Sequence, residues 1–202
     1  MNISYLGHSC FKIEYNGASV IIDPYQNGKV PGLANLDEKA NLVLCSHGHD
    51  DHNAAQLISV TGVSPFDVTF FETFHDEAQG TKRGMNKVHI IKIDGCKIVH
   101  MGDIGCELTN EQIDMLKDAD LLMIPVGGFY TIDARQAIEM IKQISPKTVI
   151  PMHYRKDNIG FDEIATVDAF LDGFDKDDIL FTNSEYNLAD NKVVVMTPQH
   201  KE

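Results

Sequence analysis

Short segments in which apolar and polar residues alternate dominate the first hundred residues of the chain. This period-two pattern is typical of strands that bury one face. The pairs Asn16-Gly17 and Asp94-Gly95 separate neighbouring segments, and such pairs favour hairpin turns because both central residues of the turn need positive φ. We therefore expect a largely antiparallel β-structure, with strands at residues 2–6, 10–15, 18–23, 41–46, 67–72, 87–93 and 96–102.

Helical spacing of apolar residues appears at 54–60, which fits a short helix, and becomes regular after residue 109. In the segment that begins at Asp133, Ala134, Ala137 and Ile141 fall on one helical face, and Thr131 or Asp133 can cap its first N–H groups. The pattern of this half predicts helices at residues 110–118, 133–144 and 164–174, which alternate with strands at 120–126, 147–152, 178–183 and 192–197.

The order of these elements predicts an α/β fold. Two β-sheets packed face to face, with helices on the outer faces, would use every predicted element. With 202 residues, 43% of them hydrophobic, the chain can bury a sizeable core, and no shift in composition marks a linker. We expect a single domain that spans residues 1–202.

Charge and cysteine usage limit the partners. The net charge of −13 disfavours long nucleic acids, which normally need a basic surface. No apolar stretch has the length of a membrane span or of a signal sequence, and the four cysteines form no CxxC pair. These features favour a cytoplasmic protein without a membrane partner, and they leave its oligomeric state open.

Residues 46–52 read SHGHDDH and follow the apolar segment NLVLC. Side chains two positions apart at a strand end can project to the same side, so His47 and His49 can bind one ion. Asp51 and His52, at the following turn, can face a second ion. Imidazole and carboxylate are ligands that suit Zn²⁺ and similar divalent ions.

Four ligands do not fill two metal sites, so this interpretation requires further ligands at other strand ends. Three residues stand where an apolar segment stops: His75 in TFHDE, Asp103 in MGDIG and His153 in PMHYR. A chance combination of this motif with three such residues is much less plausible than a metal centre. His89 and His100 lie inside predicted strands and are interpreted as buried supporting residues.

In this combination the chain resembles the metallo-β-lactamase superfamily. The resemblance rests on the His-x-His-x-Asp-His motif, on Asp23 at the end of an early strand, and on His75, Asp103 and His153 in that order. The segments GHSCFKIE, FHDEAQGTKRGMN and PMHYR look most like the short, single-domain branch of metal-dependent hydrolases, which is also similar to ascorbate-6-phosphate lactonases.

The resemblance implies a four-layer αββα sandwich of two mixed sheets, and it assigns roles to the residues named above. Asp103 would bridge two metal ions, and Asp23 would support the ligands from behind. His8, in LGHS, would support a ligand, contact the substrate or be purely structural. The remaining assignments are His47, His49 and His75 for the first ion and Asp51, His52 and His153 for the second.

Two neighbouring divalent ions can activate a hydroxide that bridges them. This chemistry predicts a hydrolase in which Asp51 and Asp103 are the catalytic carboxylates. The two ions would be Zn²⁺, with Mn²⁺ or Fe²⁺ as alternatives. The positive charge of the two ions exceeds the negative charge of the nearby aspartates, so the site should attract anions. The expected substrate is therefore a small anionic ester, lactone or phosphodiester. Lys82, Arg83 and Arg155 are candidate contacts for its negative group.

Two alternatives stay open. The protein could be a phosphodiesterase or nuclease for short oligonucleotides, or a metal-stabilised binding module without turnover. The absence of cysteine among the ligands argues against the module, because structural zinc sites are commonly rich in thiolates.

Overall fold

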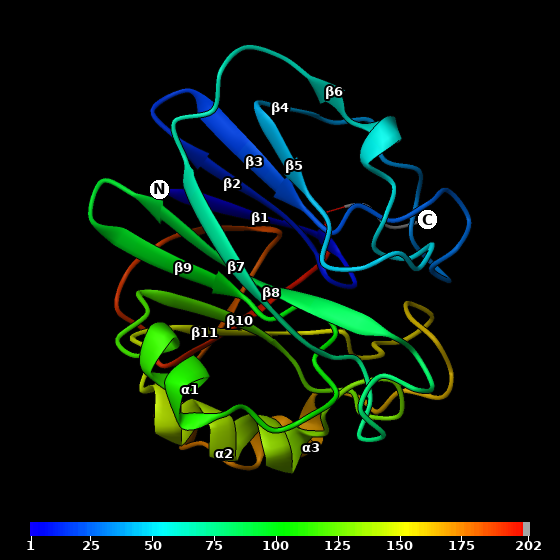
Figure 1. The fold of residues 1–202 in the computed structure, drawn as a ribbon, viewed down its shortest axis with the longest axis vertical. Helices are drawn as coiled ribbons and strands as arrows, with labels where there is room; N and C mark the ends of the chain where they lie inside the picture. Colours follow the sequence, from blue (N-terminus) through cyan, green and yellow to red (C-terminus); the bar gives the residue numbers. More distant parts are fainter. Residues whose placement is uncertain (200–202) are drawn as a thin grey trace.

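Two mixed β-sheets pack face to face in the computed structural model, which describes residues 1–199 (Figure 1). The first sheet is antiparallel except for its last pair, in which β3 and β5 run parallel. In spatial order its strands are β13 (Glu185–Asn187), β1 (Asn2–Gly7), β2 (Cys10–Tyr15), β3 (Ala18–Ile22) and β5 (Leu42–Leu44).

In the second sheet the strands from β12 to β9 run parallel to one another, and β8 and β7 follow β9 as an antiparallel hairpin. In spatial order its strands are β12 (Ile179–Thr182), β14 (Val193–Met196), β11 (Val149–Met152), β10 (Leu121–Pro125), β9 (Cys96–His100), β8 (Met85–Ile93) and β7 (Asp67–Phe74).

Alternate residues of each strand face the other sheet and form the inner core. Ile3 and Ile13 of the first sheet belong to one buried cluster with Ile98 and Met123 of the second. This arrangement follows from the period-two pattern read in the sequence, because successive side chains of a strand point to opposite faces.

The outer layers differ in composition. Helices α1 (Asn110–Leu116), α2 (Ala134–Ile144) and α3 (Asp168–Leu171) lie together below the second sheet in Figure 1. The first sheet is covered by segment 24–40, whose Tyr25 and Leu33 pack with Leu6 and Ile21. The expected α/β sandwich of two mixed sheets is confirmed, and its fourth layer is made of loops and short elements.

Three local predictions differ from the structure. Residues 54–60 form the 3₁₀ turn η1 (Ala55–Leu57) and strand β6 (Ser59–Val60), because β6 pairs with β4 (Lys39–Ala40). The predicted helix 164–174 contains only α3, because the backbone before α3 pairs with other segments: Ala165 O accepts the N–H of Arg155, and Ala165 N–H donates to Gly127 O. A second 3₁₀ turn, η2 (Lys176–Asp178), and strand β13 were not predicted.

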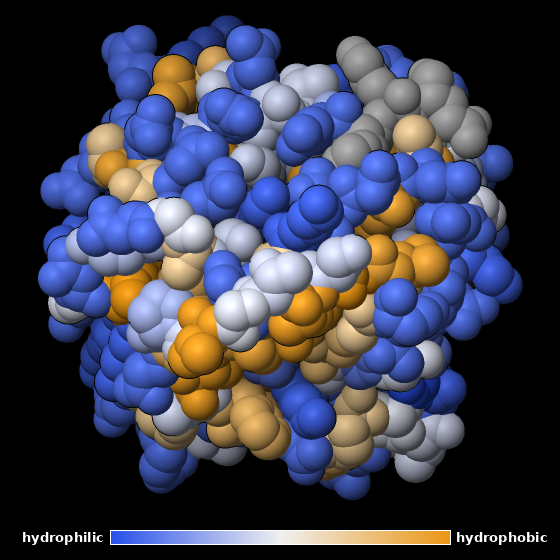
Figure 2. Space-filling model, turned by 90° about the horizontal axis from the view of Figure 1, so that it is seen from above, coloured by the Kyte–Doolittle hydropathy of each residue, from blue (hydrophilic) through white to orange (hydrophobic). Residues whose placement is uncertain are grey.

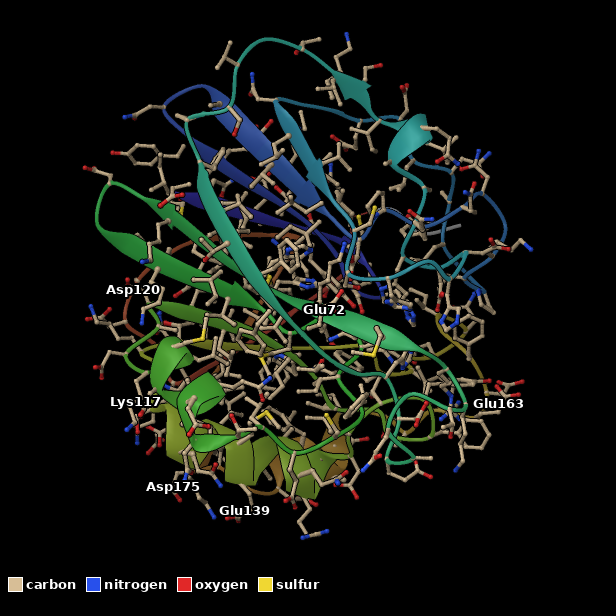
Figure 3. All side chains as sticks on the ribbon, in the orientation of Figure 1. Glu72, Lys117, Asp120, Glu139, Glu163 and Asp175 are labelled. Carbon is tan, nitrogen blue, oxygen red and sulfur yellow. The ribbon has the colours of Figure 1, made fainter. Side chains whose placement is uncertain are left out.

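Helix α2 begins at a capping box. Asp133 accepts a hydrogen bond from Gln136 N–H, and the Gln136 side chain accepts one from Asp133 N–H in return. Of the two predicted caps, Asp133 therefore holds this position. Charged side chains such as Lys117 and Glu139 extend outward from the helix layer (Figure 3).

Exposed apolar residues are concentrated away from the helices. Seen from above, apolar side chains form a band between hydrophilic areas (Figure 2). Val60 of β6, Val63 of the following loop and Phe70 of β7 are exposed. Among residues 1–199, no helix combines the length and hydropathy needed to cross a bilayer. The predicted domain ends at residue 202, and residues 200–202 lie outside the described part.

Candidate metal centre

The loops that follow β5, β7 and β11 meet on the right-hand side of Figure 1. Glu163, labelled in Figure 3, marks the loop after β11 on that side. The predicted ligands therefore come from both sheets and lie at one edge of the sandwich.

Asp103 occupies the middle of this edge and is 2% exposed. Its Oδ2 atom lies 3.1 Å from Nε2 of both His52 and His153, and 3.4 and 3.9 Å from Nε2 of His75 and His47. Four imidazoles from three separate loops thus converge on one carboxylate.

The loop of Asp103 is fixed by close packing. Asp103 N–H donates to Asn86 Oδ1 at 2.8 Å. Gly102 has a φ of +55°, and a Cβ atom there would lie 2.2 Å from the same Asn86 oxygen and 2.6 Å from Ser46 Cβ. Only glycine fits this position, and Asn86 is therefore a supporting residue that the sequence reading missed.

Three groups of ligand atoms lie close enough together to hold an ion. Within each group all atoms are within 4.8 Å of one another. The groups are His47, His49 and His75; His47, His52 and Asp103; and His8, Asp51, His52 and His153.

The donor atoms fit divalent cations. His47 Nε2, His52 Nε2 and Asp103 Oδ1 are buried and have no hydrogen-bond partner among the described residues. Unpartnered buried polar atoms are unfavourable, and bound cations would satisfy these three. The set contains imidazole and carboxylate without thiolate, which suits Zn²⁺, Mn²⁺ or Fe²⁺.

Asp23 lies behind His47 and His52 and contacts both, directly or through Ser46. Its carboxylate accepts hydrogen bonds from His52 Nδ1 at 2.9 Å, from Ser46 N–H at 2.6 Å and from Ser46 Oγ at 2.7 Å. Ser46 Oγ also lies 2.9 Å from His47 Nδ1. One buried carboxylate therefore orients His52 directly and His47 through a serine.

Electrostatics favours the ligating protonation states of Asp23, Asp103 and His47. It does not do so for His52: burial opposes its charge, but Asp103 and Asp51 outweigh burial and hold the pKa of His52 well above its usual value, so metal binding there displaces a proton. Burial opposes ionisation of Asp23, but the hydrogen bond and charge of His52 outweigh it and lower the pKa of Asp23 to about 2. Burial lowers the pKa of His47 to about 3. Asp103 is likewise buried, yet the imidazoles of His153 and His52 hold its pKa well below the usual value. Ionised carboxylates and neutral imidazole are the forms that bind metal.

His8 is fully enclosed beside this centre. Its Nε2 atom lies 3.2 Å from Asp51 Oδ2, and its ring is 4.1 Å from that of His153. Burial lowers the pKa of His8 to about 4, so the ring is neutral at pH 7. His8 thus contacts two predicted ligands directly.

A cavity of about 400 Å³ opens over the centre. Its walls contain five predicted ligands: His49, Asp51, His75, Asp103 and His153. The remaining lining residues are Lys29, Asp50, Arg83, Tyr130 and Phe161. A small substrate that enters this cavity would reach the predicted metal ligands.

The three predicted substrate contacts lie in different surroundings. Arg83 lines the cavity, with its guanidinium carbon 5.4 Å from the centroid of the Tyr130 ring. Lys82 forms an ion pair with Glu77 and lies outside the cavity wall, as does Arg155. Lys29, which the sequence reading did not select, lines the cavity and pairs with Asp50 at 2.7 Å.

Asp76 builds the loop that carries Arg83. Asp76 is 1% exposed. Its carboxylate accepts the N–H groups of Ala78, Gly80, Lys82 and Arg83 at 2.8 to 3.0 Å. The conformation of residues 76–83 is therefore fixed from within.

Comparison with known proteins agrees with this geometry. The family model described as "Beta-lactamase superfamily domain" matches residues 2–153. A UPF0173 metal-dependent hydrolase of Pelotomaculum thermopropionicum is 33% identical over 193 aligned residues, which cover 76% of this chain and 84% of the relative.

Two solved structures are similar along nearly the whole chain. A protein of the metallo-β-lactamase superfamily from Thermotoga maritima is 30% identical with a TM-score of 0.78, covering 96% of this chain and 97% of that one. The metallo hydrolase Igni18 of Ignicoccus hospitalis has a TM-score of 0.68 at 22% identity, covering 100% of this chain and 96% of its own. The second of these supports the fold alone.

Proposed function

Because the chain belongs to the metallo-β-lactamase superfamily, we propose that it is a metal-dependent hydrolase with a dinuclear centre. The observation that carries this proposal is the convergence of buried imidazole and carboxylate atoms at the floor of an open cavity. The reaction is hydrolysis of a small anionic ester, lactone or phosphodiester.

Each proposed ligand has a role. His47, His49 and His75 hold one ion, Asp51, His52 and His153 hold the other, and Asp103 lies between the two groups. The ions are Zn²⁺, with Mn²⁺ and Fe²⁺ as alternatives that the same donors accept. When bound, they supply Lewis acidity and make a water molecule nucleophilic near neutral pH.

The chain's own residues orient the reaction. Asp51 faces the cavity and accepts a hydrogen bond from a water in the attacking position. The ring of His8 contacts Asp51 Oδ2 and so holds this carboxylate in its orientation. Arg83 binds the negative group of the substrate, because its guanidinium lines the same cavity. No covalent intermediate is needed, since water is the nucleophile.

Metal content and turnover test the proposal together. Plasma mass spectrometry of tag-free protein is expected to give about two metal equivalents per chain, and Asp103→Ala or His49→Ala should lower this number while circular dichroism stays unchanged. Turnover of lactones, carboxylic esters and bis(p-nitrophenyl) phosphate should fall by roughly 10²-fold or more in both variants. Asp114→Ala, an exposed change on α1, is the matched control.

The outcomes separate the alternatives. Two equivalents of metal without turnover of any substrate would contradict a hydrolase and favour a metal-stabilised binding module. Turnover of the phosphodiester alone would favour the phosphodiesterase. One equivalent or none after dialysis against Zn²⁺ or Mn²⁺ would contradict the dinuclear centre.

A further inference from the structure

Three aromatic residues form a connected group at the mouth of the cavity. Tyr130 and Phe161 line the cavity, and their ring centroids are 6.0 Å apart in an edge-to-face arrangement. Phe129 packs edge-on against Tyr130 at 4.7 Å, and Phe161 packs edge-on against His8 at 5.4 Å. We call Phe129, Tyr130 and Phe161 the aromatic wall.

The exposure and backbone conformation of Phe129 do not stabilise the fold. Its side chain is 63% exposed, so the ring recovers little of the free energy that burial would give. Its φ of +59° is the left-handed conformation, which is a genuine outlier for a bulky residue and is commonly found at binding sites. A glycine or asparagine would suit this turn better, so the ring serves something other than stability.

Arg83 faces the aromatic wall from the opposite loop. Within residues 1–199 no carboxylate lies within 4.0 Å of its guanidinium, in contrast to Lys29 and Lys82, which are both paired. The Asp76-centred loop fixes the backbone of Arg83, so little conformational freedom is lost when it binds a ligand. The cavity therefore has an apolar side and a cationic side above the same floor.

We propose that the substrate is an anion that carries a flat apolar group, such as an aryl ester with an ionised acid group or an aryl phosphodiester. The anionic group lies between Arg83 and the metal ligands, and the flat group stacks on Tyr130 and Phe161 with Phe129 at the rim. This inference rests on the proposed function and adds its substrate class.

Two phosphonates that differ only in the flat group provide the test. Isothermal titration of the metal-loaded protein should show phenylphosphonate binding at least about ten-fold more tightly than methylphosphonate, because an aromatic contact adds to the burial of the ring. In Phe161→Ala and Tyr130→Ala this preference should fall to about two-fold or less. Arg83→Ala should weaken both ligands and leave their ratio nearly unchanged.

Phe129→Ala keeps the experiment decisive if the other variants unfold. Its ring is mostly exposed, so the fold should tolerate the change, and the preference should fall by about three-fold. Phe181→Ala on β12 is the matched control, since Phe181 is 67% exposed and lies outside the cavity wall. The control should keep the full preference.

The failure of this inference differs from the failure of the proposed function. Equal affinities for the two phosphonates, in a protein that binds metal and hydrolyses esters, would contradict the proposed role of the aromatic wall and leave the hydrolase intact. An unchanged preference in Phe161→Ala and Tyr130→Ala would also overturn that role. Absence of turnover with metal bound would overturn the hydrolase, and the substrate class with it.

Discussion

Asp23 is the residue on which the geometry of both proposed ion sites depends. It accepts hydrogen bonds from His52 and Ser46, and Ser46 contacts His47, so it fixes one ligand from each group. A partner behind a metal-ligating histidine sets which ring nitrogen is free to bind and how the ring points.

Asp23→Asn should lower metal affinity without removing any ligand. The amide carries no charge, and it can offer only one oxygen where the carboxylate offers two. We expect metal affinity to fall by about 10- to 100-fold, measured by competition with a chromogenic chelator. Asp120→Asn, which also removes a carboxylate that accepts a backbone N–H, is the control. Unchanged affinity in Asp23→Asn would show that the backbone alone orients His52.

The convergence of the proposed ligands was easier to predict from the sequence than the walls of the cavity. Each ligand follows an apolar segment, and strand ends at one edge converge whatever the loops do. Tyr130 and Phe161 lie on loops without a periodic pattern, and these loops are joined by long-range contacts that the local sequence does not specify, such as Ala165 N–H to Gly127 O. The role of Asp76 could not be predicted, because an aspartate that accepts four N–H groups has the same local sequence as a solvated turn.

At the scale of elements, strands β8 and β9 place two buried histidines opposite each other. His89 pairs with His100 in the register of this hairpin. His100 Nδ1 accepts the Gly102 N–H at 3.1 Å, and its Nε2 lies 2.9 Å from Ser9 O, so the neutral ring satisfies both contacts. Burial lowers the pKa of both rings.

His100→Gln should make the fold less sensitive to acid. The pKa of His100 is lower in the folded state than in the unfolded chain, where it is about 6.5. Unfolding therefore takes up a proton as the pH falls below 6.5, and stability is lost in that range. The wild type should lose about 1 kcal/mol more than the variant between pH 7.5 and 5.5, measured by urea unfolding of metal-free protein. Equal losses would show that the pKa of His100 is the same in the folded and unfolded states.

The prediction of elements failed where pairing between distant segments decides the structure. Segment 54–60 has helical spacing, but β6 pairs with β4 and ends the helical turn after η1. Strand β13 has three residues and exists because β1 offers a free edge. The hairpins were predicted correctly, since their turn residues and alternation are local.

At the scale of the whole molecule, the net negative charge of the protein repels the proposed anionic substrate. The chain has 30 aspartates and glutamates against 17 lysines and arginines. The field of this excess reaches about 30 Å at 10 mM salt and only about 8 Å at 150 mM. Charges inside the cavity are screened much less, so salt should remove mainly the long-range repulsion.

The kcat/KM for bis(p-nitrophenyl) phosphate should therefore rise by about two- to five-fold between 10 and 150 mM NaCl. The neutral ester p-nitrophenyl acetate should show no such trend, and it serves as the control in the same assay. A fall in kcat/KM for the anion would mean that the positive charge of the site dominates already at long range.

The proposed ligands come from both sheets, and this arrangement has a consequence for the timing of biosynthesis. His47, His49, Asp51 and His52 are synthesised about one hundred residues before His153, which corresponds to about 5 to 20 s of translation. During that interval the early ligands are present without their partners from β9 and β11. The centre can therefore be completed only late in synthesis, and an ion taken up earlier is held by a partial set of ligands until the second sheet closes over it.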